Sequence, residues 1–194
     1  MTEPLQKLFG SAARLKLLRL FLFNPKDTYT VPDAAYRSRV PERTAHKELA
    51  LFSTIGLIKR SPTRSGSGVR YSVNEHFEYV AVLQNLLINA PARAKDIYET
   101  IRSAGAIKLI VVAGVFVGDW EGRLDVLVVA DRLKERVLRT KMRTFESEIG
   151  RELRYAMLAA SDFGYRLNMN DKLVRDVMDY PHRIVFDRLN IGLK

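Results

Sequence analysis

The stretch from Val31 to Val73 constrains the fold of this chain more than any other part of the sequence. Its pattern of apolar residues, proline and glycine predicts a helix, a turn, a second helix and the two strands of a hairpin: Val31–Ser38, Arg39–Pro41, Glu42–Ile55, Gly56–Arg60 and Val69–Val73. A helix pair followed by a hairpin can place one helix in a groove of DNA and rest a loop on the DNA backbone.

The second of these helices has an apolar stripe on one side and polar residues on the others. We expect four residues at three- and four-residue spacing to face the core: Ala45, Leu49, Phe52 and Ile55. The N-terminal half of such a helix meets the base edges. The polar residues there form the first part of a predicted DNA-binding site: Arg43, Thr44, His46 and Lys47. Arg43 can pair with guanine, Thr44 can contact a thymine methyl or a phosphate, and Lys47 can contact a phosphate.

The hairpin is basic. Lys59, Arg60, Arg64 and Arg70 surround Ser65–Gly68, and no acidic residue lies between Lys59 and Asn74. Glycine allows the tip to approach a phosphate backbone closely, and arginine supplies the charge. Residues 1–75 hold 13 Lys/Arg and 6 Asp/Glu, a balance of +7, out of +10 for the whole chain. These four cations complete the predicted DNA-binding site, and an excess charge that only aids solubility is the alternative.

This order of elements resembles the winged helix-turn-helix domains of small bacterial and archaeal repressors of the ArsR/MarR type. The resemblance covers residues 4–75, and Gly10–Leu18 is similar to the first core helix of that group. We expect a helix over Pro4–Phe23, which Ser11 divides in two if it caps a second segment after Gly10. The resemblance implies binding of double-stranded DNA, and two half-sites favour a homodimer.

Residues 76–104 are predicted to form a helical connector. Apolar residues recur at helical spacing over Phe77–Asn89 and again over Ala92–Ser103. Two interpretations stay open, a dimer interface and a connector packed between domains, because periodicity indicates a buried stripe and not its partner.

Residues 105–194 are predicted to form a second domain, in which strands and helices alternate. The expected strands are Ala106–Val117, Arg123–Ala130, Glu152–Ala160 and Ile184–Asp187. The expected helices run from Asp131 to Gly150, from a cap at Ser161–Asp162, and over Asp171–Tyr180. The fold class expected for the chain is therefore α+β, an N-terminal winged helix-turn-helix joined to a C-terminal α/β domain.

Gly114–Phe116 and Arg123–Val129 together resemble the nucleotidyltransferase fold of the polymerase-beta superfamily. The tail from Ser161 to His182 is similar to the end of such domains, and the resemblance spans residues 104–190. In that family a Gly-Ser turn holds the triphosphate and an Asp-x-Asp pair holds divalent metal. Val115 stands at the serine position and Arg123 at the first acidic position, so that Asp125 is left alone.

A third carboxylate is sought near Leu153–Tyr155, where this chain has Arg154. Asp119 and Glu121 could substitute, although acids on a turn are usually solvated. Two-metal phosphoryl transfer needs clustered carboxylates that bring two cations within about 4 Å of each other. We therefore expect an inactive domain with no catalytic residue, no metal and no cofactor. Three residues mark its vestigial nucleotide site: Gly114, Arg123 and Asp125.

The leading hypothesis is a sequence-specific transcriptional regulator. Its C-terminal domain serves dimerisation, partner contact or sensing of a nucleotide or small-molecule effector. The alternatives are an active nucleotidyltransferase acting on a nucleotide, RNA or small molecule, and an antitoxin-like interaction protein. The chain has no cysteine, no secretory leader pattern and no apolar run of membrane-spanning length. A cytoplasmic location without membrane association is expected.

Overall fold

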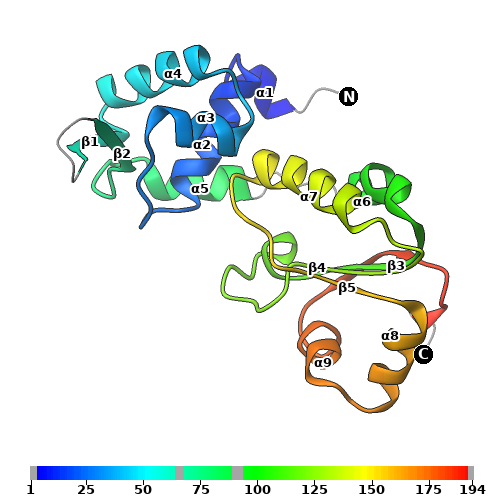
Figure 1. Cartoon of the computed structure of the whole chain (residues 1–194). Coiled ribbons are helices and arrows are strands. Elements are labelled where there is room, and N and C mark those ends of the chain that lie inside the picture. The colour runs from blue at the N-terminus through cyan, green and yellow to red at the C-terminus, as the bar shows by residue number, and fades with distance from the viewer. Residues whose placement is uncertain (1–3, 64–67, 89–93, 192–194) are drawn as a thin grey trace. The chain divides into compact units, whose positions relative to one another are not determined.

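The structure is a computed structural model and describes residues 4–63, 68–88 and 94–191. These residues form a mixed α+β fold with one two-stranded and one four-stranded sheet (Figure 1), which confirms the expected α+β class. The chain divides into two compact units. The first unit comprises Met1–Ala90 with Glu146–Arg151, and the second comprises Pro91–Phe145 with Glu152–Lys194.

The first unit is built around a nearly buried central helix. A short helix α1 (Pro4–Leu8) precedes α2 (Ala12–Leu22), and the Ser11 hydroxyl accepts a hydrogen bond of 3.2 Å from the backbone N–H of Arg14. Ser11 therefore caps a separate second helix, as one of the two sequence interpretations had it. Every residue from Leu17 to Leu22 is buried, so that α2 contacts the core on most of its circumference.

Two further helices, a hairpin and a fifth helix surround α2. They are α3 (Val31–Ser38), α4 (Glu42–Thr54), β1 (Ile58–Pro62), β2 (Val69–Val73) and α5 (Val80–Ile88). The strands β1 and β2 are antiparallel, and the backbone of Tyr29 pairs with that of Tyr71 beside them. One buried cluster joins all of these elements, including Leu17, Phe21, Tyr29, Ala35, Leu49, Phe52, Leu57, Tyr71, Val73 and Leu87.

The second unit contains a four-stranded sheet in the order β5-β4-β3-β6. Its strands are β3 (Ala106–Val112), β4 (Val126–Asp131), β5 (Tyr155–Leu158) and β6 (Arg183–Asp187). Strand β3 is antiparallel to β4 and β6, and β4 is parallel to β5. Helices α6 (Ala94–Ile101) and α7 (Glu135–Ile149) cover one face, and α8 (Ala160–Asn168) and α9 (Lys172–Met178) cover the other (Figure 1).

Alternation along β3 and β4 directs side chains to both helical layers. Leu109, Val111, Leu127 and Val129 pack with Phe163 of α8 and with two valines of α9, Val174 and Val177. The intervening residues Ile110, Val112, Val126 and Val128 are also fully buried, and their side chains point to the opposite face. Burial on both faces explains why these strands read as continuous apolar runs in the sequence.

Several predicted element boundaries in the second unit are wrong. The helix expected from Asp131 begins at Glu135, and the strand expected over Glu152–Ala160 spans Tyr155–Leu158. The strand expected over Ala106–Val117 ends at Val112, because Gly114 has a φ of +51° and begins a short 3-10 helix, η2 (Gly114–Val117). The strand expected from Arg123 begins at Val126, after a loop. The N-cap of α8 is Ala159 and makes no side-chain cap hydrogen bond, so Ser161 and Asp162 lie inside the first turn of that helix.

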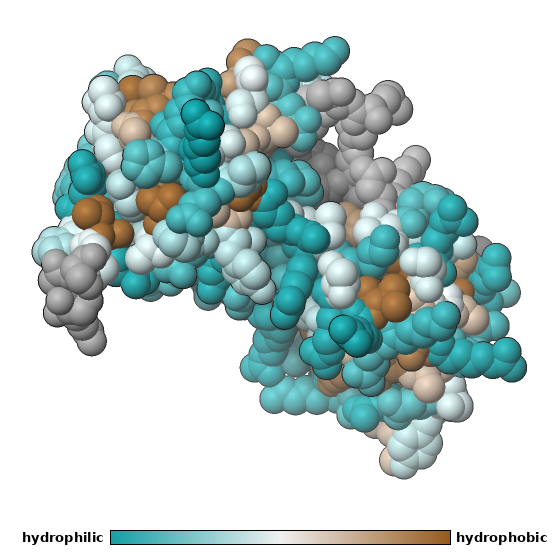
Figure 2. Space-filling model, turned by 45° about the horizontal axis from the view of Figure 1, so that its top comes forward, coloured by the Kyte–Doolittle hydropathy of each residue, from teal (hydrophilic) through white to brown (hydrophobic). Residues whose placement is uncertain are grey.

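Hydrophilic residues cover most of the face drawn in Figure 2, and hydrophobic residues form scattered patches there. Within the part of the chain that the structure describes, no helix combines the length and the apolar character needed to cross a membrane.

Candidate functional site

Local caps set the position of the two helices that carry the predicted DNA-binding residues. The Thr30 hydroxyl accepts a hydrogen bond from the backbone N–H of Asp33, and the Asp33 carboxylate accepts one from the N–H of Thr30. These hydrogen bonds, the one from the Thr30 backbone above all, lower the pKa of Asp33. Arg39 ends α3 in the left-handed region, with a φ of 52°, and Pro41 leads into α4.

The inward face of α4 contains the expected apolar residues, with one exception. Ala45, Leu49 and Phe52 are almost completely buried, whereas Ile55 is 50% exposed. The expectation for Ile55 is wrong because α4 ends at Thr54, after which helical periodicity no longer determines which way a side chain points. The chain turns at Gly56, whose φ is +81°, and Leu57 enters the core instead.

An ion pair between the half-buried Arg14 of α2 and the buried Glu48 of α4 links these two helices. Glu48 lies on the inward face of α4 and is only 5% exposed. Its carboxylate accepts hydrogen bonds of 2.8 and 3.4 Å from Arg14, whose guanidinium also donates to the backbone carbonyl of Phe9. The sequence-based prediction did not include this pair. The three-residue spacing from Ala45 to Glu48 was the signal that places Glu48 on the inward stripe of the helix.

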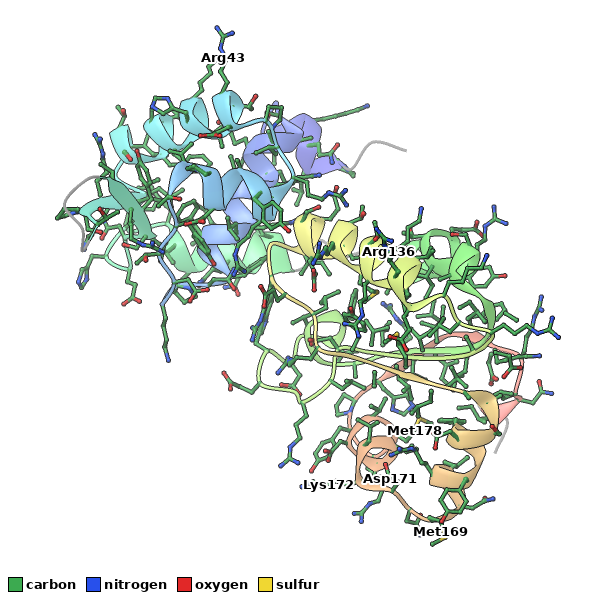
Figure 3. The ribbon with its side chains drawn as sticks, in the orientation of Figure 1. Arg43, Arg136, Met169, Asp171, Lys172 and Met178 are labelled. Carbon is green, nitrogen blue, oxygen red and sulfur yellow. The ribbon has the colours of Figure 1, made fainter. Side chains whose placement is uncertain are left out.

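The outward face of α4 is polar and basic in its N-terminal half. Arg43, His46 and Lys47 are exposed, and Arg43 points away from the helix (Figure 3). In the described part of the chain none of these three side chains makes a hydrogen bond or ion pair. Thr44 is half-buried and lies at the edge of this face. Ala50 is exposed one turn further along α4. Because its side chain is small, a ligand can approach the helix backbone closely there.

The hairpin is held at a fixed distance from the end of α4. Asn74 donates from its backbone N–H to the carbonyl of Leu57 (2.8 Å) and from its side chain to the carbonyl of Gly56 (2.9 Å). These bonds tie the end of β2 to the turn that follows α4. The two strands therefore leave from a defined place beside the C-terminus of that helix.

The four cations predicted on the hairpin differ in their environments. Lys59 and Arg60 are exposed on β1, and the Arg60 guanidinium lies 5.9 Å from the centre of the Tyr71 ring. Arg70 donates to the hydroxyl (2.7 Å) and the carbonyl of Thr28, and so anchors β2 to the preceding loop. Arg64 lies outside the described residues.

In the second unit, Gly114 and Asp125 are in direct contact. Asp125 is completely buried, and a Cβ atom added to Gly114 would overlap its Oδ1. The Asp125 carboxylate accepts hydrogen bonds from the backbone N–H of Val115 (3.1 Å), from the backbone N–H of Arg154 (2.8 Å) and from two guanidinium nitrogens of Arg154 (3.0 Å each). All of its acceptor capacity is thus used inside the chain.

Arg154, which stands where the resemblance to nucleotidyltransferases predicts an acid, neutralises this carboxylate. The hydrogen bonds with Asp125 raise the pKa of Arg154, and the charges of Asp119 and Glu121 add to the effect, although burial opposes it. The described residues contain no group of three or more side chains suited to hold a metal ion. The Asp125 carboxylate is engaged in a closed ion pair with Arg154.

Arg123, the third residue of the predicted vestigial site, does not face Asp125. Its guanidinium lies 3.2 Å from the carboxylate of Asp176 on α9, and the two form an exposed ion pair. Arg123 is therefore not the ion-pair partner of Asp125, although only one residue separates the two in the sequence. The loop before β4 turns the Arg123 side chain outward, and Arg154, which is distant in sequence, takes that role.

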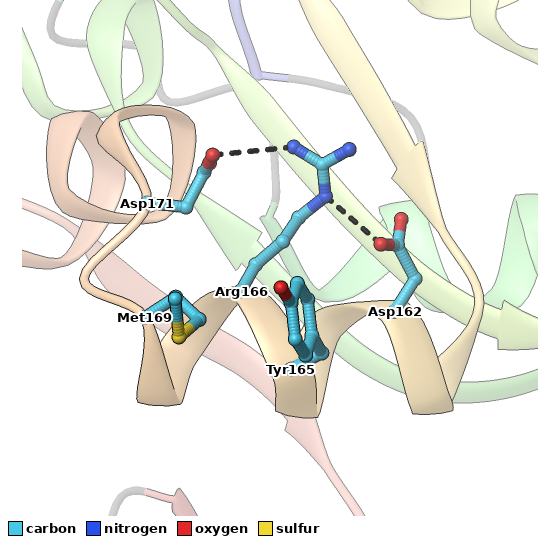
Figure 4. A pocket seen from close by; sticks show the side chains of 5 residues that line it. All are labelled: Asp162, Tyr165, Arg166, Met169 and Asp171. Atoms are coloured by element: carbon cyan, nitrogen blue, oxygen red, sulfur yellow. Dashed lines mark hydrogen bonds and ion pairs between the residues drawn. The ribbon is translucent and has the colours of Figure 1, made fainter.

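A shallow pocket of about 280 Å³ lies along α8 and the loop to α9 (Figure 4). Arg166 donates to Asp162 (3.0 Å) and to Asp171 (3.4 Å), and the first of these hydrogen bonds raises the pKa of Arg166. Asp171 also accepts from the backbone N–H of Leu173 and caps α9. Because these charges already satisfy one another, we interpret this pocket as a structural connection between the two helices.

Comparison with protein-family models, with curated proteins and with solved structures found no match to this chain.

Proposed function

We propose that this chain is a sequence-specific DNA-binding transcriptional regulator. In this proposal the first unit is a winged helix-turn-helix domain, α4 is its recognition helix and the β1–β2 hairpin is its wing. The observation that supports it most is the two-sided character of α4. One face is buried and held by the Arg14–Glu48 pair, and the other presents Arg43, His46 and Lys47, which have no partners among the residues that the structure describes.

The residues of this surface divide into three proposed roles. Arg43 and Thr44 read base edges, because they lie in the first turn of α4, and His46 contacts a base or a phosphate in the next turn. Lys47, Lys59, Arg60 and Arg64 bind phosphates. Arg70 acts as a positioning residue. Its guanidinium donates hydrogen bonds to Thr28 and so holds the wing in place.

The second unit, in this proposal, is a nucleotidyltransferase-like domain that has lost its chemistry. This proposal is supported by the Asp125–Arg154 pair, because the Arg154 guanidinium binds the carboxylate that a metal would need as a ligand. The unit then serves dimerisation, partner contact or binding of a small-molecule effector. Incubation with magnesium and labelled nucleoside triphosphates tests this part. Transfer that disappears in Asp125→Ala would contradict it.

The DNA-binding proposal is tested by selecting genomic fragments that the full chain retains and measuring affinity for the selected duplex and for a scrambled duplex. Arg43→Ala should weaken binding to the selected duplex by about 1–3 kcal/mol and relax its preference at one base pair. Lys59→Ala should weaken binding to both duplexes equally and lower the salt slope by about one. Lys172→Ala, an exposed cation of the second unit, is the control. Equal losses for Arg43→Ala on both duplexes would contradict the proposed base readout.

A further inference from the structure

Helix α7 and the loop before it carry a row of basic side chains that the proposed function does not use. Between positions 132 and 143 the chain has six basic residues and a single acidic one, Glu135. The six basic residues are Arg132, Lys134, Arg136, Arg139, Lys141 and Arg143. The positive balance of residues 76–194 is only +3, so the sum over the second half of the chain conceals this concentration.

Helical geometry places the arginines of α7 on one face. Leu138 and Met142 are almost fully buried on the sheet side. Arg136, Arg139 and Arg143 are exposed and recur at three- and four-residue spacing, so they form a line about 10 Å long on the other side. Arg136 projects from α7 away from the sheet (Figure 3).

Five of these six cations differ from most others of the second unit in lacking an acidic partner among the described residues. Ion pairs engage the following residues elsewhere in that unit: Arg102, Lys108, Arg123, Arg154, Arg166 and Arg175. In the row only Arg139 is paired, with Glu135 at 3.6 Å. Within the described residues the other five have no ion-pair partner. Like charges at this spacing disfavour a helix, so this arrangement carries a cost that a polyanionic ligand would remove.

We propose that the exposed face of α7 binds the phosphate backbone of a nucleic acid, as a second contact surface separate from α4. The fork of an arginine side chain matches phosphate oxygens, and four of the six cations are arginines. An acidic protein is the weaker candidate, because protein interfaces need apolar or aromatic anchors in their centre. The exposed residues of α7 are all polar: Glu135, Arg136, Arg139, Thr140 and Arg143.

The test uses the full chain with Arg136→Glu and Arg143→Glu combined, and a labelled duplex of arbitrary sequence. Lys172→Glu combined with Arg183→Glu is the matched control, because it changes the net charge equally on exposed cations of the same unit. The α7 variant should bind more weakly and lose about two from the slope of log affinity against log salt. The control should keep the wild-type slope.

Equal slopes for the α7 variant and the wild type would overturn the inference, and so would an equal loss in the control. Arg136→Gln with Arg143→Gln gives the same test without charge reversal should the first variant not fold. Binding of a polyglutamate peptide in preference to the duplex would assign the face to an acidic protein and overturn the inference as well. If Arg43→Ala alone weakens DNA binding, the proposed function is supported and the second surface is not. If the α7 variant alone weakens binding, the second surface is supported and the proposed role of α4 is not.

Discussion

Asp125 lies in the interior of the second unit with its charge fully compensated by the chain itself. Two backbone N–H groups and the guanidinium of Arg154 surround it, and Gly114 leaves the space that its Oδ1 occupies. A buried carboxylate is costly unless it is paired and hydrogen-bonded. At this position the same guanidinium that satisfies the carboxylate also prevents it from serving as a metal ligand.

We predict that Arg154→Ala destabilises the chain by about 3–5 kcal/mol, because it leaves the buried Asp125 carboxylate without its counter-charge. Arg123→Ala removes an exposed arginine that pairs with Asp176 and should cost less than about 1 kcal/mol. Urea unfolding followed by circular dichroism measures both. A loss in Arg154→Ala no larger than that in Arg123→Ala would show that the buried pair does not hold the unit together.

The identity of the residue beside Asp125 could not be predicted from the sequence. The resemblance to nucleotidyltransferases predicts an acid at the position of Arg154, but it does not predict a contact between residues 29 positions apart. Arg123, only two positions from Asp125, is closer to it in the sequence than Arg154 is. Its side chain nevertheless pairs with Asp176, because residues before Val126 form a loop and not the expected strand.

At the scale of the elements, α3 shows how far local chemistry determines a boundary. Its predicted range, Val31–Ser38, agrees with the structure, because Thr30 and Asp33 form a capping box and Pro32 suits the first turn. The end of β3 was not predictable in the same way. An apolar run extends from Leu109 to Val117. Periodicity alone does not show that its first part belongs to strand β3 and that a 3-10 helix begins at Gly114.

The cap of α3 makes a pH-dependent contribution to stability. The pKa of Asp33 is lower in the folded state than its ordinary value of about 3.9, so the ionised carboxylate contributes its full stabilisation above that ordinary pKa. The stabilisation is lost as the pH falls through the lowered pKa of the folded state. Asp33→Asn should therefore be less stable than the wild type by about 0.5 kcal/mol at neutral pH, after allowance for solvent screening. The two proteins should converge once the pH has fallen below the lowered pKa of Asp33.

Thermal unfolding across this pH range measures the difference. Glu75→Gln, which neutralises another exposed carboxylate of the first unit, is the matched control for the loss of one negative charge. A difference between Asp33→Asn and the wild type that persists unchanged in acid would show that the carboxylate charge does not contribute to the cap.

For the whole molecule, the distribution of charge matters more than its sum. Along the sequence, residues 1–75 hold most of the positive surplus, and the remainder has a balance of only +3. In the folded second unit many acids pair with arginines or lysines, whereas five of the six cations in the row have no ion-pair partner among the described residues. Ion pairs in the folded chain determine which charges remain available to a ligand. A count of charges along the sequence does not reveal these pairs.

The proposed regulator should bind its operator as a homodimer, because a single recognition helix contacts too few base pairs for high specificity. Light scattering should give two chains per duplex on a site selected from genomic DNA. Two recognition helices on one side of the duplex require half-sites about 34–36 Å apart. Insertion of about half a helical turn between the half-sites should therefore weaken binding far more than insertion of about one full turn. A complex of one chain per duplex, with unchanged affinity for an isolated half-site, would contradict the dimer.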